Sequence, residues 1–438
     1  MNAKILAEQI FMSGVESVMP ARIIEKNVFK KNETLFIAGH EVNLESVENI
    51  YVIGAGKASA KMGEAIENIL DDRITGGQIV VKYGHACELK FVNVSEAGHP
   101  LPDYNGYAAT QNILNIVTQA NENDLVICLI SGGGSALLTD FPAGTSIDDL
   151  ILANQLLLKS GADIKEINTV RKHLSNVKGG QLAKAAHPAM LISLVLSDVI
   201  GDPLDMIASG PTVPDPTTFI DALVVLEKYQ LLPDMPPTFL EYVQNGISGL
   251  HPETPKPGDR VFDNIRNIVV ANNKIALEGC RQKANELGLN CFIISSQLEG
   301  NTADVAEYLI EEALAFQKDG NIEKPCCLLF GGETTLKVSG NGTGGRNQHL
   351  ALCAALLLKD KPGITFLAAG TDGSDGPTAA AGAVVDSQTF PAAASRYLDI
   401  EKYLDNFDSY HFFETAGGHV ITGPTMTNVM DLIVILVE

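Results

Sequence analysis

The sequence predicts an α/β protein made of two domains in tandem, and three observations support this prediction. Short apolar runs that stop at Gly, Ser or Asp alternate with helix-like stretches along most of the chain. Nearly continuous apolar strands separated by helices are typical of a parallel sheet covered on both faces. The length of 438 residues favours two or three domains, and a Pro-rich segment between Leu232 and Gly258 interrupts the alternation. We therefore expect one domain over residues 1–240 and a smaller α/β domain over residues 241–438.

The first predicted domain contains four apolar strands. The first of them ends at a glycine-rich turn and is followed by a helix-like stretch from Lys57 to Leu70. This order of elements predicts a Rossmann-like three-layer sandwich with a mostly parallel sheet. The expected strands are Ile50–Ile53, Gln78–Val81, Asp124–Ile130 and Leu191–Leu196.

The second predicted domain resumes the same alternation after the Pro-rich segment. A helix is expected over Ala303–Phe316, between two of its strands. The expected strands are Ile268–Ala271, Cys291–Ser295, Cys327–Phe330 and Thr365–Ala369.

Composition argues against several classes of protein. The 31 basic and 53 acidic residues give a formal net charge of −22, which disfavours binding to nucleic acid or to an anionic membrane. No apolar stretch reaches the ~18 residues that a membrane span needs, and the first residues lack the pattern of a signal peptide. The seven cysteines are odd in number and form no Cys-x-x-Cys pair, which favours reduced thiols. We expect a cytoplasmic protein.

The loops at the carboxyl ends of the strands are the places to search for a site, because ligands of open α/β sheets bind there. The first such loop contains Gly54, Gly56 and Lys57, and it opens a helix whose N-terminus can receive an anion. It does not match a Walker A loop, and Ser59 replaces the third glycine of a dinucleotide fingerprint. Lys82 also stands where that fingerprint needs an acidic residue. A tight strand-to-helix turn without a ligand is the alternative interpretation.

The loop after the next strand is more specific. Four small residues and a serine follow a buried strand and precede a helical run, so their backbone N–H groups can hold phosphate oxygens. A nucleophile elbow would need Gly where Leu137 stands, which excludes that motif. A crowded turn is the alternative. The loop consists of Ser131, Gly132, Gly133, Gly134 and Ser135.

Two further features of the first domain carry charge. Asp198 stands at the end of a strand, where a carboxylate can accept a hydroxyl proton or hold a metal. The segment 169–180 gathers Arg171, Lys172, His173 and Lys178 in an otherwise acidic chain. A solvated helix face is the alternative for this segment.

The second domain offers a cation and several acids. Glu333 and Thr334 follow a strand, and a Gly-rich loop leads to Arg346 at the expected start of a helix. A cation at a helix N-terminus is mildly unfavourable for folding, so a bound anion is the better explanation for Arg346 at this position. A nearby carboxylate that pairs with Arg346 is the alternative explanation. The loop with Asp372 and Asp375 lacks the final Glu of an EF-hand, which favours Mg²⁺ held by one or two acids and substrate phosphates.

The ordered motifs of this chain strongly resemble those of the class II glycerate kinases. These proteins carry a MOFRL-type C-terminal domain, and some are labelled hydroxypyruvate reductases. The resemblance implies ATP-dependent phosphorylation of D-glycerate to 2-phosphoglycerate with Mg²⁺, in a cleft between two α/β domains. The motifs are Gly54–Ser59, Ser131–Leu138, Ser197–Asp202, Gly331–Thr335, Gly344–Gln348 and Gly370–Gly373.

The resemblance also implies roles for single residues. Lys57 and Arg346 are the leading catalytic candidates, and Asp198 is the expected base for the acceptor hydroxyl. Small-molecule substrates are expected, with no nucleic acid or membrane partner, and a homodimer is the candidate assembly. The expected metal ligands are Asp198, Glu333 and Asp372. The expected nucleotide-binding residues are Gly54, Gly56, Ser131, Gly132, Gly133, Gly134, Ser135, Glu333 and Thr334.

One departure and two alternatives remain. Met426 and Met430 stand where the family usually has Gly and Asn, which puts substrate identity in doubt more than reaction type. An NAD(P)-dependent hydroxypyruvate reductase is the runner-up, and the incomplete dinucleotide fingerprint argues against it. A non-catalytic protein that senses a small anion is the other alternative. An aspartate beside loops that can bind phosphate argues against it, because simple binding of an anion does not need a carboxylate.

Overall fold

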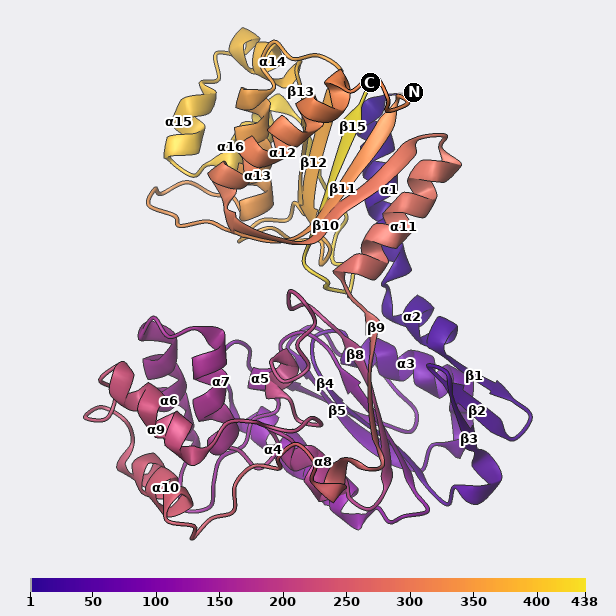
Figure 1. The fold of residues 1–438 in the computed structure, drawn as a ribbon, viewed down its shortest axis with the longest axis vertical. Helices are drawn as coiled ribbons and strands as arrows, with labels where there is room; N and C mark the ends of the chain where they lie inside the picture. Colours follow the sequence, from indigo (N-terminus) through magenta and orange to yellow (C-terminus); the bar gives the residue numbers. More distant parts are fainter. Residues whose placement is uncertain (1) are drawn as a thin grey trace. The chain divides into compact units, whose positions relative to one another are not determined.

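A computed structural model describes residues 2–438, which form two compact units (Figure 1). One unit contains residues 23–270. The other contains residues 271–438 together with the N-terminal segment up to Arg22. Among the described residues, no helix combines the length and apolar character needed to cross a bilayer.

The unit of residues 23–270 contains the predicted, mostly parallel sheet. Its strand order is β6-β5-β4-β7-β8-β9, and the pairs β4–β5, β4–β7, β5–β6 and β7–β8 are parallel. All six residues of β7 are buried, as expected for a strand covered on both faces. The strands are β4 (Ile50–Ala55), β5 (Gly76–Lys82), β6 (Asn93–Ala97), β7 (Leu125–Ile130), β8 (Met190–Leu196) and β9 (Ile265–Ala271).

Helices cover both faces of this sheet, which confirms the predicted three layers. Helix α4 (Tyr104–Gln119) shares a core cluster with Val126 and Cys128 of β7. Helix α3 (Ser59–Leu70) approaches the sheet at Leu129, whose side chain points to the opposite face because strand residues alternate. A helical layer with its own core is formed by α6 (Ile147–Lys159), α7 (Ile164–His173), α9 (Phe219–Lys228) and α10 (Pro237–Ile247).

A small antiparallel sheet in this unit was not predicted. It consists of β1 (Val28–Lys31), β2 (Thr34–Ile37) and β3 (His40–Asn43), in that order, after helix α2 (Pro20–Asn27). These strands are four residues each and only partly buried, so no long apolar run marks them in the sequence.

The other unit contains a mixed sheet in the order β10-β11-β15-β12-β13-β14. The β10–β11 pair is parallel, and the remaining pairs are antiparallel. The strands are β10 (Asn290–Asn301), β11 (Cys326–Thr335), β12 (Ile364–Gly370), β13 (Gly382–Asp386), β14 (His419–Val420) and β15 (Asp431–Val437).

Helices flank this second sheet as well. Helices α12 (Thr302–Lys318) and α13 (Arg346–Leu357) share one core cluster with alternate residues of β11, β12 and β15. The N-terminal helix α1 (Ala3–Ser17) packs against α11 (Asn273–Glu286), as Figure 1 shows. The remaining helices are α14 (Thr389–Ser395), α15 (Ile400–Asp405) and α16 (Ser409–Ala416).

The units differ from the predicted domains at both ends. The expected boundary at residue 240 falls inside α10, and β9 joins the first sheet although it was expected in the second domain. The Pro-rich segment is not a free linker, because the hydroxyl of Thr254 donates to Asp215 at 3.0 Å and the N–H of Asp215 donates to the carbonyl of Pro255 at 2.9 Å. Proline content therefore marked an irregular segment rather than a division of the chain.

Candidate active site

The two glycine-rich loops of the first unit meet at the carboxyl ends of β4 and β7. The N–H of Lys57 donates to the carbonyl of Gly132 at 2.9 Å, and the N–H of Ala58 donates to the Ser131 hydroxyl at 3.0 Å. Gly56 has a φ of +138°, and a Cβ at this position would lie 2.1 Å from the Ser131 hydroxyl oxygen. Glycine is required here because the loops approach so closely.

Asp198 extends from the end of β8 onto the same loops. A Cβ added to Gly132 would lie 2.0 Å from a carboxylate oxygen of Asp198, so this carboxylate lies directly against the loop backbone. Burial raises the pKa of Asp198 above its ordinary value, and the nearby charge of Lys57 partly opposes that effect. The structure thus brings Lys57, the second glycine loop and Asp198 together, as the sequence predicted.

Three backbone N–H groups of the second glycine-rich loop have no acceptor in the described part of the chain. Within residues 2–438, the N–H groups of Gly132, Gly133 and Ser135 donate no hydrogen bond to another protein group. Lys57 likewise forms no ion pair with a carboxylate of the described chain. Free N–H groups beside an unpaired ammonium group favour an anionic ligand.

Two histidines at this edge were missed by the sequence analysis. The ring of His99 lies against Gly133, where a Cβ would be 3.0 Å from a ring carbon. Burial, together with the positive charges of Lys57 and Lys82, lowers the pKa of His99 to about 4, so the ring is neutral at pH 7. His85 places Nδ1 3.1 Å from the carbonyl oxygen of Lys57. The position of His99 just after strand β6 could have identified it, because the carboxyl end of β6 lies at the same edge of the sheet as the two glycine-rich loops.

A chain of polar side chains supports the second loop from behind. The hydroxyls of Ser135 and Ser209 are 2.7 Å apart, and Ser209 donates to the side-chain oxygen of Asn168 at 2.9 Å. Asn168 and Ser209 are buried. This network fixes the orientation of Ser135 from helix α7.

Arg346 was predicted to be a cation without a protein partner that binds an anion, and the structure shows it paired with carboxylates. Its Nε donates to Asp431 at 2.6 Å, its Nη2 donates to the other oxygen of Asp431 at 3.0 Å, and its Nη1 lies 2.6 Å from Glu333. Burial acts to lower the pKa of Arg346, but the hydrogen bond and charge of Asp431 and the charge of Glu333 outweigh it and raise that pKa. The structure therefore shows the alternative explanation, in which Arg346 pairs with nearby carboxylates.

The neighbouring predicted residues have local partners as well. Thr334 is buried, and its hydroxyl lies 3.4 Å from that of Thr302. Asp375 accepts hydrogen bonds from the N–H groups of Asn347 at 3.1 Å and Gln348 at 2.8 Å, so it caps the start of α13. Burial raises the pKa of Asp375 to about 6, against the effect of these donors.

The carboxylates offer a limited set of metal ligands. Over residues 2–438, no group of three or more His, Cys, Asp or Glu side chains could hold an ion. Asp198 belongs to one unit, whereas Glu333 and Asp372 belong to the other, and one oxygen of Asp372 accepts from Ser374 at 2.9 Å. Neither unit thus offers a cage of protein ligands within its described residues, and Mg²⁺ held by one or two carboxylates and by substrate phosphates stays a prediction.

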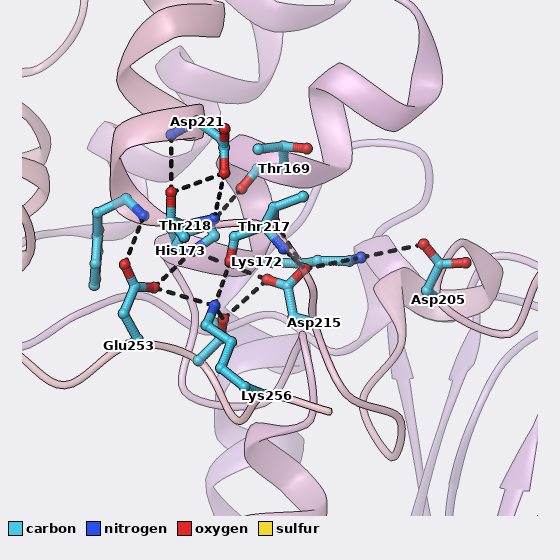
Figure 2. Close-up of polar contacts among 12 residues, drawn as sticks. Thr169, Lys172, His173, Asp205, Asp215, Thr217, Thr218, Asp221, Glu253 and Lys256 are labelled. Atoms are coloured by element: carbon cyan, nitrogen blue, oxygen red, sulfur yellow. Dashed lines mark hydrogen bonds and ion pairs between the residues drawn. The ribbon is translucent and has the colours of Figure 1, made fainter. Parts of the chain in front are cut away.

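The basic side chains of the segment 169–180 fall into two groups. Lys172 is only 3% exposed and lies 3.5 Å from both Asp205 and Asp215, which excludes a solvated face for this residue. His173 lies 3.2 Å from Glu253 through Nε2 and donates from Nδ1 to a backbone carbonyl. Figure 2 shows Lys172 beside Asp205 and Asp215, and His173 beside Glu253. Arg171 and Lys178 instead line a pocket next to Ser135.

Comparisons with known proteins match this architecture over the whole chain. Residues 6–244 match a domain of unknown function (DUF4147), and residues 326–431 match the MOFRL family. The Glycerate 2-kinase of Pyrococcus horikoshii is 40% identical over 100% of this chain and 98% of its own length. The D-glycerate 2-kinase of Thermotoga maritima is 40% identical over 100% of this chain and 99% of its own. An Agrobacterium vitis relative named for hydroxypyruvate reductase is 41% identical over 88% of this chain and 86% of its own.

The solved structures agree with the sequence relatives. The crystal structure of a glycerate kinase from Thermotoga maritima has a TM-score of 0.89 and 39% identity, and the match covers 100% of this chain and 99% of that one. The order of the motifs, the two domain matches and the full-length relatives lead to one assignment. The chain belongs to the class II glycerate kinases, the family that joins a DUF4147 domain to a MOFRL domain.

Proposed function

We propose that this protein transfers the γ-phosphoryl group of ATP to the 2-hydroxyl of D-glycerate, giving 2-phosphoglycerate and ADP. Membership of the family and the names of the full-length relatives support this reaction. The observation that carries the proposal is the position of the Asp198 carboxylate against Gly132, beside Lys57 and backbone N–H groups that make no other bond.

Phosphoryl transfer requires mainly the positioning of two anions and the stabilisation of charge on the transferring group. The N–H groups of Gly132, Gly133 and Ser135 hold phosphate oxygens, and the Lys57 ammonium group supplies positive charge. The neutral ring of His99 contacts the ligand without adding charge. Gly56 lets the two loops approach each other, and Gly54 lets strand β4 lie close to Leu129 of β7.

Asp198 accepts the proton of the 2-hydroxyl. As the hydroxyl oxygen bonds to the γ-phosphorus, its proton passes to the Asp198 carboxylate, and the bond to the β-phosphate oxygen breaks to release ADP. The raised pKa of Asp198 makes its carboxylate a stronger base than that of an exposed aspartate.

The resemblance to the family is the ground for proposing contacts with residues of the other unit. Asp431 and Glu333 take three of the five N–H donors of Arg346, and the side chain is 34% exposed, so two donors remain for a phosphate. Glu333, Thr334 and Asp372 are the proposed nucleotide and metal contacts of this unit. Mg²⁺ bound to the nucleotide neutralises phosphate charge. A cytoplasmic location and a homodimer stay predictions.

The test is a comparison of two reactions on the purified wild-type protein. We expect formation of 2-phosphoglycerate from D-glycerate and MgATP, loss of this activity on exhaustive chelation, and recovery with Mg²⁺. We expect no oxidation of NADH or NADPH with hydroxypyruvate. Reductase activity without kinase activity would overturn the proposal, as would full kinase activity after chelation for the metal.

The role of Asp198 is tested with Asp198→Asn. Loss of a general base lowers kcat by about 10²–10⁴-fold, and the fall of the wild-type rate at acidic pH should disappear from the variant's profile. A circular dichroism melt checks that the variant is folded. A variant with intact kcat and a raised KM for glycerate would show that Asp198 orients the substrate without acting as the base.

A further inference from the structure

A narrow pocket adjoins the second glycine-rich loop inside the unit of residues 23–270. Ser135 belongs both to that loop and to the pocket wall. The polar lining of the pocket includes Arg171 of α7, and its apolar lining comes mainly from α6 and from the loop that follows His99. This apolar lining includes Pro100, Leu150, Ala153, Leu157 and Leu174.

The polar groups on one side of the pocket are already bonded to each other. Lys178 donates to the carbonyl of Leu138 at 2.6 Å and lies 3.5 Å from Asp140. Asp140 accepts from the Ser175 hydroxyl at 2.5 Å and also from the N–H of Asn176. A ligand that needed these groups would have to break an existing buried network.

On the other side, Arg171 has donors left over. Its Nε donates to the side-chain oxygen of Asn154 at 2.7 Å, and the Asn154 amide nitrogen donates in turn to the carbonyl of Leu150 at 2.9 Å. The guanidinium forms no ion pair with any carboxylate of residues 2–438. Burial lowers the pKa of Arg171, as expected for a half-buried cation without a counter-ion. Its terminal nitrogens therefore favour an acceptor supplied by a ligand.

The chemistry of the pocket lining selects among the ligands of the proposed reaction. Each carbon of D-glycerate carries oxygen, so this acid has no apolar body to place against leucine, alanine and proline side chains. A purine base has apolar faces, and its ring nitrogens are acceptors of the kind that Arg recognises on bases. The ring can also stack on a guanidinium.

We propose that this pocket holds the purine base of the nucleotide, with Arg171 donating to a ring acceptor. The inference rests on the proposed function, because it takes the N–H groups of the adjacent loop as the phosphate site. The base then lies on the Ser135 side of that loop, while Lys57 and Asp198 lie on the Gly132 side, next to the transferring phosphoryl group.

The experiment distinguishes binding of the base from binding of the phosphates. Calorimetry measures the affinity for ADP, which has a base, and for tripolyphosphate, which has none. Arg171→Met should weaken ADP about tenfold or more, which corresponds to one lost base contact, and should leave tripolyphosphate binding unchanged. Ala153→Leu, which adds volume inside the pocket, should weaken ADP in the same selective way. Lys184→Met removes one exposed positive charge of the same unit and is the matched control.

Three outcomes would overturn the proposal, and a fourth separates it from the proposed function. Equal weakening of ADP and tripolyphosphate by Arg171→Met would make Arg171 a phosphate contact. Unchanged ADP binding in both variants, each folded by its melting curve, would exclude a base site. A raised KM for D-glycerate with unchanged ADP binding would assign the pocket to the acid. Selective loss of ADP binding in a protein whose wild type does not phosphorylate glycerate would support the base site and refute the proposed acceptor.

Discussion

Lys57 and Arg346 are two cations that follow glycines and stand at or just before the start of a helix. Lys57 precedes α3 and is free of carboxylate partners among the described residues, whereas Arg346 begins α13 and is held by Asp431 and Glu333. The local sequence is similar in the two cases. Asp431 is 85 residues from Arg346 in the chain, so only the folded sheet brings the pair together.

The pairing changes the expected stability of an Arg346 variant. Arg346→Met leaves the carboxylate of Asp431, which is 2% exposed, buried without its partner. We expect a loss of about 2 kcal/mol in the free energy of unfolding, between the values for exposed and buried ion pairs, because Arg346 itself is partly exposed. Urea denaturation measures this loss.

Two further variants control that experiment. Lys57→Met removes a cation that has no carboxylate partner in the described chain, so its free energy of unfolding should match that of the wild type. Adding Asp431→Asn to Arg346→Met should recover part of the lost stability, because a neutral amide costs less to bury than a carboxylate. An Arg346→Met variant as stable as the wild type would show that the pair contributes nothing to folding.

The segment that precedes β15 shows how an element can carry backbone strain. Met426 and Met430, which replace the family's usual Gly and Asn, have φ values of +61° and +71°. Glycine and, less readily, asparagine adopt this left-handed region, whereas other side chains cost about 1–2 kcal/mol there. The sequence analysis connected these positions with substrate identity, and the structure adds a conformational reason for the residues that the family prefers.

Met426→Gly should therefore stabilise the protein by about 1 kcal/mol if the relief of strain exceeds the added flexibility of the unfolded chain. Met426→Ala is the matched control, because it removes the side chain beyond Cβ and keeps the steric conflict. Thermal melting of both variants distinguishes strain from side-chain packing. Equal effects of Gly and Ala would contradict the conformational explanation.

At the scale of the whole molecule, the two units give a prediction about fragments. Residues 23–270 include β9 and the segment that carries Glu253 and Lys256, whereas a fragment ending at residue 240 lacks them. The shorter fragment loses an edge strand, the contact of His173 with Glu253 and the hydrogen bond from Thr254 to Asp215. We expect cooperative unfolding of the 23–270 fragment.

The 23–240 fragment should melt at least about 10 °C lower or show no cooperative transition, because it lacks edge strand β9 and the hydrogen bonds that Glu253 and Thr254 make. Circular dichroism melts of both purified fragments provide the comparison. Indistinguishable melting of the two fragments would mean that the predicted boundary at residue 240 is the functional division of the chain.

The sequence by itself determined the class of the protein and most of its regular elements. Apolar runs predicted β4, β7, β8 and β12 to within two residues at each end, because strand burial on both faces leaves a direct record in the chain. It also placed Lys57, the glycine-rich loops and Asp198 at one edge, since parallel strands end on the same side of a sheet.

The tertiary structure decided what depends on residues far apart in the chain. It assigned α1 to the unit of the C-terminal residues, where a Cβ at Gly14 would lie 2.3 Å from the sulfur of Cys280, and it gave β9 to the first sheet. It also paired Arg346 with Asp431 and placed His99 beside Gly133. Local propensity and motif spacing carry no information about such contacts, because their energies arise only when the distant partners are packed together.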